Sequence, residues 1–255
     1  MTLHEGSPVR MINLNETIVV GLLTIFIAAI IQGITGFGFA LIAVPILSVF
    51  LLPKDIIPIV VIYSLIMNII MYIKKRYHIR FSDLKTLIIF SAIGIPLGVL
   101  LLNILDANII KLVTAIVIIL TAFALISGWE WKGKDTQFTT AVVGLTSGIL
   151  NGSTSMSGPP IVLFLINQKF CKEHFRSYLP AFGIITNLIT IIFFLIGKNI
   201  NATQLEYTII FSPALFCGLF LGMILVNYIN EYLFRRLSLI LILITGFYTF
   251  FAVLI

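Results

Sequence analysis

The sequence predicts an all-α, polytopic membrane protein. Of its 255 residues, 60% are hydrophobic and only 10% are charged, whereas soluble domains carry roughly 25% charged residues. The mean hydropathy is +1.15. Apolar stretches of about twenty residues recur along the chain, which is the length an α-helix needs to cross the hydrocarbon core of a bilayer. These observations exclude an ordinary soluble domain.

Six stretches have the length and composition of full transmembrane helices. They are residues 56–74, 84–105, 109–128, 178–197, 205–227 and 233–254.

Two further hydrophobic regions, 17–52 and 138–168, are interrupted by polar, glycine-rich segments. The interruptions read GITGFG at 33–38 and NGSTSMSG at 151–158. The arms of the second region have about 13 and 10 residues, or about 20 and 15 Å of helix, so neither arm spans the bilayer. We therefore expect two broken, re-entrant helical hairpins, which bring the total to about eight membrane elements.

Positive charge supports this topology. If both hairpins return to their starting side, 12 of the 16 Lys and Arg residues face one side of the membrane and 4 face the other. If each interrupted region crossed once, the split would be 9 against 7. Cytoplasmic loops carry the excess of Lys and Arg, so both termini are expected outside; a pair of short spanning helices would give the same sidedness. Loop charge also accounts for the isoelectric point near 9.4 without a nucleic-acid partner.

The two interrupted regions resemble each other. QGITGFG at 32–38 aligns with NGSTSMS at 151–157 at an offset of 119, which also carries Asn68 onto Asn187. Further along the offset becomes 124, where GIPLG at 94–98 meets GLFLG at 218–222 and Asn103 meets Asn227.

Each half then contains one hairpin and three spans, and the halves begin on opposite sides of the membrane. We expect inverted repeats over 17–128 and 138–255, preceded by an extracytoplasmic segment 1–16. Many secondary transporters share this architecture and bind substrate near the midplane, where their broken helices meet.

The interruptions are the candidate substrate site, because irregular backbone at this depth must face protein or a water-filled cavity. Gly152 is expected to end the first helix of its hairpin in a left-handed conformation, and Pro159 and Pro160 to begin the second. N–H groups near Ser157 and Gly158 would then form the positive end of a helix, which attracts anions. The segment GFG at 36–38 is expected to present the equivalent terminus from the opposite side.

The interior favours an anionic substrate. All ten acidic residues and all three histidines lie in termini, loops or span edges, so no intramembrane carboxylate binds a cation or relays protons. The residues expected to bind the substrate are Gln32, Gly33, Thr35, Gly36, Gly38, Asn151, Gly152, Ser153, Thr154, Ser157 and Gly158. Asn68 and Asn187 form a second group that either contacts the substrate or bonds across helices. Arg176 either gates the site or anchors a helix at the interface.

Other motifs have structural interpretations. The GxxxG pairs at 94–98 and 218–222 are typical of close helix packing. SMSGPP at 155–160 contains a Ser-Gly pair, but no His or Lys lies in the interior to activate a serine, so no catalytic residue is expected. Cys171 and Cys217 predict neither a disulfide framework nor a metal site. No cofactor is expected, and the oligomeric state is left open.

The sequence resembles the TauE/SafE family of sulfite and organosulfonate exporters. The resemblance rests on QGITGFGFALIAVPIL at 32–47, GILNGSTSMSGPPIVLFL at 148–165 and the Phe-Arg-Ser that follows at 175–177, and it extends from about residue 17 to 254. Residues 155–157 depart from the more glycine-rich pattern of many members. The resemblance implies an exporter of small sulfur-containing anions, such as sulfite or sulfoacetate, in the cytoplasmic membrane.

The sequence therefore predicts a transporter that holds a small anion at opposed helix N-termini near the midplane. Two alternatives remain open: a passive channel for the same anions, and a membrane subunit without transport activity that packs against a partner. In the second case, the polar tips would only join helices.

Overall fold

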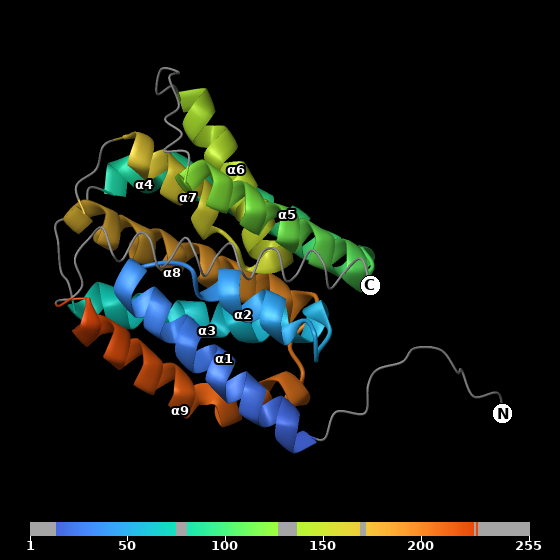
Figure 1. Ribbon diagram of the computed structural model, residues 1–255. Helices are drawn as coiled ribbons and strands as arrows, with labels where there is room; N and C mark the ends of the chain where they lie inside the picture. Colours follow the sequence, from blue (N-terminus) through green and yellow to red (C-terminus); the bar gives the residue numbers. More distant parts are fainter. Residues whose placement is uncertain (1–13, 75–80, 127–136, 169–171, 227, 229–255) are drawn as a thin grey trace.

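The computed structural model describes residues 14–74, 81–126, 137–168, 172–226 and 228. Within them, the regular elements are all helices (Figure 1). These are α1 (Leu14–Thr35), α2 (Phe39–Leu47), α3 (Pro53–Lys74), α4 (Phe81–Ile104), α5 (Ala107–Ile126), α6 (Gln137–Thr154), α7 (Gly158–Asn167), α8 (Lys172–Ile196) and α9 (Ala202–Leu225).

The predicted fold class is confirmed. Among the described residues, five helices contain stretches apolar and long enough to cross a membrane. They are Ile18–Thr35, Pro53–Lys74, Leu84–Ile104, Ser177–Ile196 and Gln204–Leu225.

Four of these stretches match predicted spans closely, namely those in α3, α4, α8 and α9. The span predicted at 109–128 corresponds to α5, an apolar helix of 20 residues. The span predicted at 233–254 lies outside the described residues, as does nearly all of the N-terminal segment 1–16.

Both interrupted regions form two helices separated by three irregular residues, at 36–38 and 155–157. The helices of the first region differ greatly in length. With 22 residues α1 is about 33 Å long and reaches the length of a span, whereas α2 has 9 residues and extends about 14 Å. In the second region α6 has 18 residues and α7 has 10.

The prediction that Gly152 ends the first helix of its hairpin is wrong. The helix α6 continues through Gly152 to Thr154, so it is five residues longer than the 13-residue arm expected from sequence, and the left-handed residue that follows it is Ser155, with φ +61°. Gly152 instead lies against α4, where an added Cβ would come within 2.5 Å of the Ile95 carbonyl oxygen. The glycine is needed for close helix packing rather than for a turn.

Two helix pairs make the most extensive contacts: α4 with α6 and α1 with α9 (Figure 1). Both contacts are lined with glycines that let the backbones approach, so the packing role predicted for the two GxxxG pairs is confirmed. In α4 the glycines are Gly94 and Gly98, and in α9 they are Gly218 and Gly222. A third row, Gly144, Gly148 and Gly152, lies on the α6 side of its contact.

Gly148→Ala is expected to lower the free energy of unfolding by about 1–3 kcal/mol through overpacking. An added Cβ would lie 2.2 Å from the Ser91 carbonyl oxygen, and backbone there cannot move away easily. Gly158→Ala is the matched control, because its Cβ would meet Phe37 at an ordinary 3.7 Å. Thermal unfolding of both purified variants in detergent measures the difference, and equal stability would contradict the packing role.

Candidate functional site

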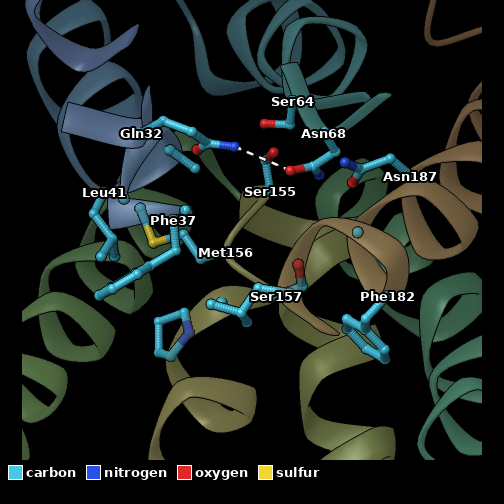
Figure 2. A pocket seen from close by; sticks show the side chains of 17 residues that line it. Gln32, Phe37, Leu41, Ser64, Asn68, Ser155, Met156, Ser157, Phe182 and Asn187 are labelled. Carbon is cyan, nitrogen blue, oxygen red and sulfur yellow. Dashed lines mark hydrogen bonds between the residues drawn. The ribbon is translucent and has the colours of Figure 1, made fainter. Parts of the chain in front are cut away.

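A cavity lies where the two helix breaks meet (Figure 2). Its volume of about 50 Å³ gives room for a few water molecules or a small ion. Both breaks contribute to its lining, together with facing segments of α3 and α8, and none of the lining residues is charged. They are Gln32, Gly36, Phe37, Gly38, Ala40, Leu41, Ser64, Asn68, Ser155, Met156, Ser157, Gly158, Pro159, Leu179, Phe182, Gly183 and Asn187.

The first break is closed locally by Thr35 at the end of α1. Its hydroxyl accepts a hydrogen bond from the Phe37 N–H at 2.9 Å and donates to the Phe37 carbonyl oxygen. Gly36 and Gly38 have φ of +88° and +104°, a conformation that glycine adopts without a steric penalty. The Thr35 hydroxyl thus satisfies both backbone groups of Phe37 at the break, and α2 begins at the cavity.

A chain of amide hydrogen bonds starts at this helix terminus. The Phe39 N–H, the first of α2, donates to Gln32 Oε1 at 3.1 Å. Gln32 Nε2 then donates to Asn68 Oδ1 at 3.2 Å, a contact drawn in Figure 2. Because the helix N–H requires an acceptor, it fixes which way Gln32 points, and Gln32 in turn fixes Asn68. The amino group of Asn68 is thus left as a donor on the cavity side.

The second break repeats the amide pair but not its anchor on a helix N–H, because Asn151 Oδ1 has no hydrogen-bond partner among the described residues. Asn151 Nδ2 donates to Asn187 Oδ1 at 3.1 Å and to Thr190 Oγ1 at 2.8 Å. Asn151 is completely buried, whereas Asn187 lines the cavity. With its oxygen occupied by Asn151, Asn187 also has its amino group left to donate. Each cavity asparagine therefore has an amino group left to donate, while its oxygen already accepts one hydrogen bond.

The second break contains a buried hydroxyl with no partner. Ser155 is only 6% exposed, and among the described residues its Oγ has no hydrogen-bond partner. Its neighbours differ, because Ser153 and Thr154 donate to the carbonyl oxygens of Ile149 and Leu150 within α6. Among the hydroxyl residues 153–157 at the second break, Ser155 is the one that is buried, lines the cavity and has an Oγ without a partner in the described part of the chain.

The N-terminus of α7 offers fewer donors than the sequence suggested. The helix starts at Gly158, so Pro159 and Pro160 lie in its first turn as predicted. Neither proline has a backbone N–H. Of the first three residues of α7, only Gly158 therefore has a backbone donor, and it lines the cavity. The contribution of α7 to the cavity is therefore mainly the positive end of its dipole.

Seven of the thirteen residues predicted to bind substrate line the cavity, and six lie behind it. Those that line it are Gln32, Gly36, Gly38, Asn68, Ser157, Gly158 and Asn187. Those behind it are Gly33 and Gly152, which pack against helices, Thr35, which closes the first break, Asn151, which holds Asn187, and Ser153 and Thr154, which bond to α6. The side chain of Arg176 lies outside the described part of α8, so its gating role stays a prediction.

Sequence reasoning missed Ser64, Ser155, Gly183 and the apolar part of the lining. Ser64 and Gly183 lie four residues before Asn68 and Asn187, so helical spacing from the predicted asparagines would have found them. Figure 2 shows Ser64, Asn68 and Asn187 grouped on one side of the cavity. The apolar lining residues are Phe37, Ala40, Leu41, Met156, Pro159, Leu179 and Phe182.

Comparison with known proteins places the chain in a family. The family model described as sulfite exporter TauE/SafE matches residues 21–249, which include both breaks and every residue that lines the cavity. No match was found among curated proteins or among solved structures. The matched family consists of membrane transporters rather than enzymes. The chain belongs to the sulfite exporter TauE/SafE family of multi-pass membrane transporters.

Proposed function

We propose that this protein exports small sulfur-containing anions, such as sulfite, sulfoacetate or related sulfonates, and binds them in the cavity between the two helix breaks. The observation that carries the proposal is the orientation of Asn68 and Asn187. Their oxygens accept hydrogen bonds from Gln32 and Asn151, so their amino groups are the ones left to donate. An anion requires donors, and a cation would require the oxygens.

The helix termini add to this preference. The first turns of α2 and α7 lie at the cavity, and helix N-termini carry partial positive charge. No charged side chain in the lining opposes or replaces this field. Neutral donors of this kind replace the water that an anion loses on entering. The apolar lining accommodates the organic part of a sulfonate.

We also infer that the two halves are inverted repeats. The offset of 119 that aligns the sequences carries the pair Gln32–Asn68 onto Asn151–Asn187, and each pair is joined by an amide hydrogen bond.

The glycine contacts support the same relation. An added Cβ at Gly98 of α4 would lie 2.2 Å from the Ile149 carbonyl oxygen of α6. The aligned positions are Gly222 of α9 and Ile30 of α1, where the corresponding distance is 2.3 Å. Each half thus packs its fourth helix against the first helix of the other half. Matching contacts at aligned positions support a repeat over chance similarity between apolar sequences.

The apolar side of the cavity departs from the proposed symmetry. At the offset of 119, Tyr63 aligns with Phe182 and Val60 aligns with Leu179. Phe182 and Leu179 line the cavity and are buried in the smaller apolar cluster, whereas Tyr63 and Val60 do not line it and are fully buried in the larger one. Tyr63 also donates a 2.6 Å hydrogen bond to the Thr208 carbonyl oxygen of α9.

This difference favours a transporter over a passive channel. In a two-fold arrangement, the position of Tyr63 is packed shut while the aligned position of Phe182 lines the cavity. Rocking of one repeat against the other would exchange the two environments, as alternating access requires.

Asn68→Asp is expected to abolish sulfite flux, because a carboxylate of the same shape presents an acceptor oxygen to the anion. The same change at Asn103 is the matched control, since Asn103 is exposed at the end of α4 and bonds to Asn199. Labelled sulfite and sulfoacetate uptake into liposomes that contain monodisperse protein measures both. Absence of flux in the wild type would contradict the proposed function, and full flux in Asn68→Asp would contradict the proposed binding site.

Alternating access predicts opposite accessibility for Tyr63→Cys and Phe182→Cys in a background that lacks Cys171 and Cys217. A membrane-impermeant thiol reagent should label Phe182→Cys from one side of the membrane and Tyr63→Cys, more slowly, from the other. Mass spectrometry after labelling of right-side-out and inside-out vesicles gives the readout. Labelling of both positions from the same side would exclude the exchange.

A further inference from the structure

The two helix breaks adopt a left-handed residue at aligned positions, but with different amino acids. Gly36 in the first break has φ +88° and Ser155 in the second has φ +61°, and both line the cavity. A side chain is disfavoured in this conformation, so glycine is the residue that the backbone prefers. A Cβ at Gly36 would meet nothing within 4 Å. Lack of space is therefore not the reason that the first break has glycine where the second has serine. The serine is therefore not explained by the fold of the break.

The hydroxyl of Ser155 adds a second cost. Its Oγ is buried without a partner among the described residues, and an unpaired buried donor destabilises a protein. In Figure 2 Ser155 lies with Ser64 and Asn68 at the polar side of the cavity. A ligand that accepts a hydrogen bond from Ser155 would explain why serine is present here despite the backbone strain and the unpaired hydroxyl.

We propose that Ser155 determines selectivity by donating its hydroxyl proton in a hydrogen bond to one oxygen of the bound oxyanion. Together with the amino groups of Asn68 and Asn187, it places donors from three chain segments around one anion. An oxyanion has several oxygens and matches donors at separate positions. A halide also accepts several hydrogen bonds, but only from donors that converge on one point, so donors at separate positions match it less well. Ser155 thus favours sulfur oxyanions over chloride, an inference that rests on the proposed function.

The test compares Ser155→Ala and Ser155→Gly with wild type in the full-length protein, by titration calorimetry with sulfite and with chloride. Removal of a hydrogen bond to a charged group is expected to weaken sulfite binding about tenfold or more, while chloride binding stays the same. Ser155→Gly should at the same time raise the thermal unfolding midpoint, since glycine relieves the left-handed strain. Lower affinity with higher stability is a combination that a purely structural serine would not produce.

Ser147→Ala is the matched control. Ser147 in α6 is also fully buried with an unpaired Oγ among the described residues, but it does not line the cavity. Its removal should leave the affinities for both anions unchanged. If Ser155→Ala does not fold, Ser155→Gly still tests the hydroxyl, because it carries the residue that the first break uses at the aligned position.

The outcomes separate this inference from the proposed function. Wild-type protein that binds no sulfur oxyanion would overturn both. Sulfite binding that is retained in wild type and unchanged in both Ser155 variants would overturn only the role of Ser155. An equal loss of sulfite and chloride binding would also overturn it, since Ser155 would then maintain the shape of the cavity without selecting between anions.

Discussion

The structure depends on one constraint: a broken helix inside a membrane must satisfy the hydrogen bonds that its break exposes. At the first break Thr35 bonds both backbone groups of Phe37, and Gln32 accepts from the first N–H of α2. That second bond reaches beyond the break, because it orients Gln32 and through it Asn68. A local requirement of the backbone thus sets the chemical character of a side chain 36 residues further along the chain.

The glycine contacts hold these tips in place. The helices that lead to the two breaks, α1 and α6, are each pressed against a helix of the other half. Lipid is as apolar as the helices, so association depends on close van der Waals packing, which glycine permits. Gly33 and Gly152 lie within the last turn of these helices and contact α9 and α4. The cavity is therefore bounded by elements whose positions are fixed by packing rather than by loops.

Sequence predicted the parts that depend on local pattern. Hydropathy located the spans of α3, α4, α8 and α9, and polar residues with glycine and proline located both breaks. Sequence could not assign the role of Gly152, because glycine serves equally in a left-handed turn and in a helix contact. It also could not separate Asn187, which lines the cavity, from Asn151, which holds it from behind. That distinction depends on how α6 faces α8, and no local pattern records it.

The proposed site consists of neutral amides with a fixed orientation, and this affects the free energy of the empty site during transport. An arginine would hold an anion more strongly, but the empty site would then leave an unpaired charge inside the membrane, which is expensive. An exporter passes through its empty state in every cycle. Asn68 and Asn187 carry no net charge, and in the proposed transport cycle their oxygens would stay bonded to Gln32 and Asn151 with or without the anion. Under the proposed function the binding free energy would then be modest, so that the anion could leave on the far side.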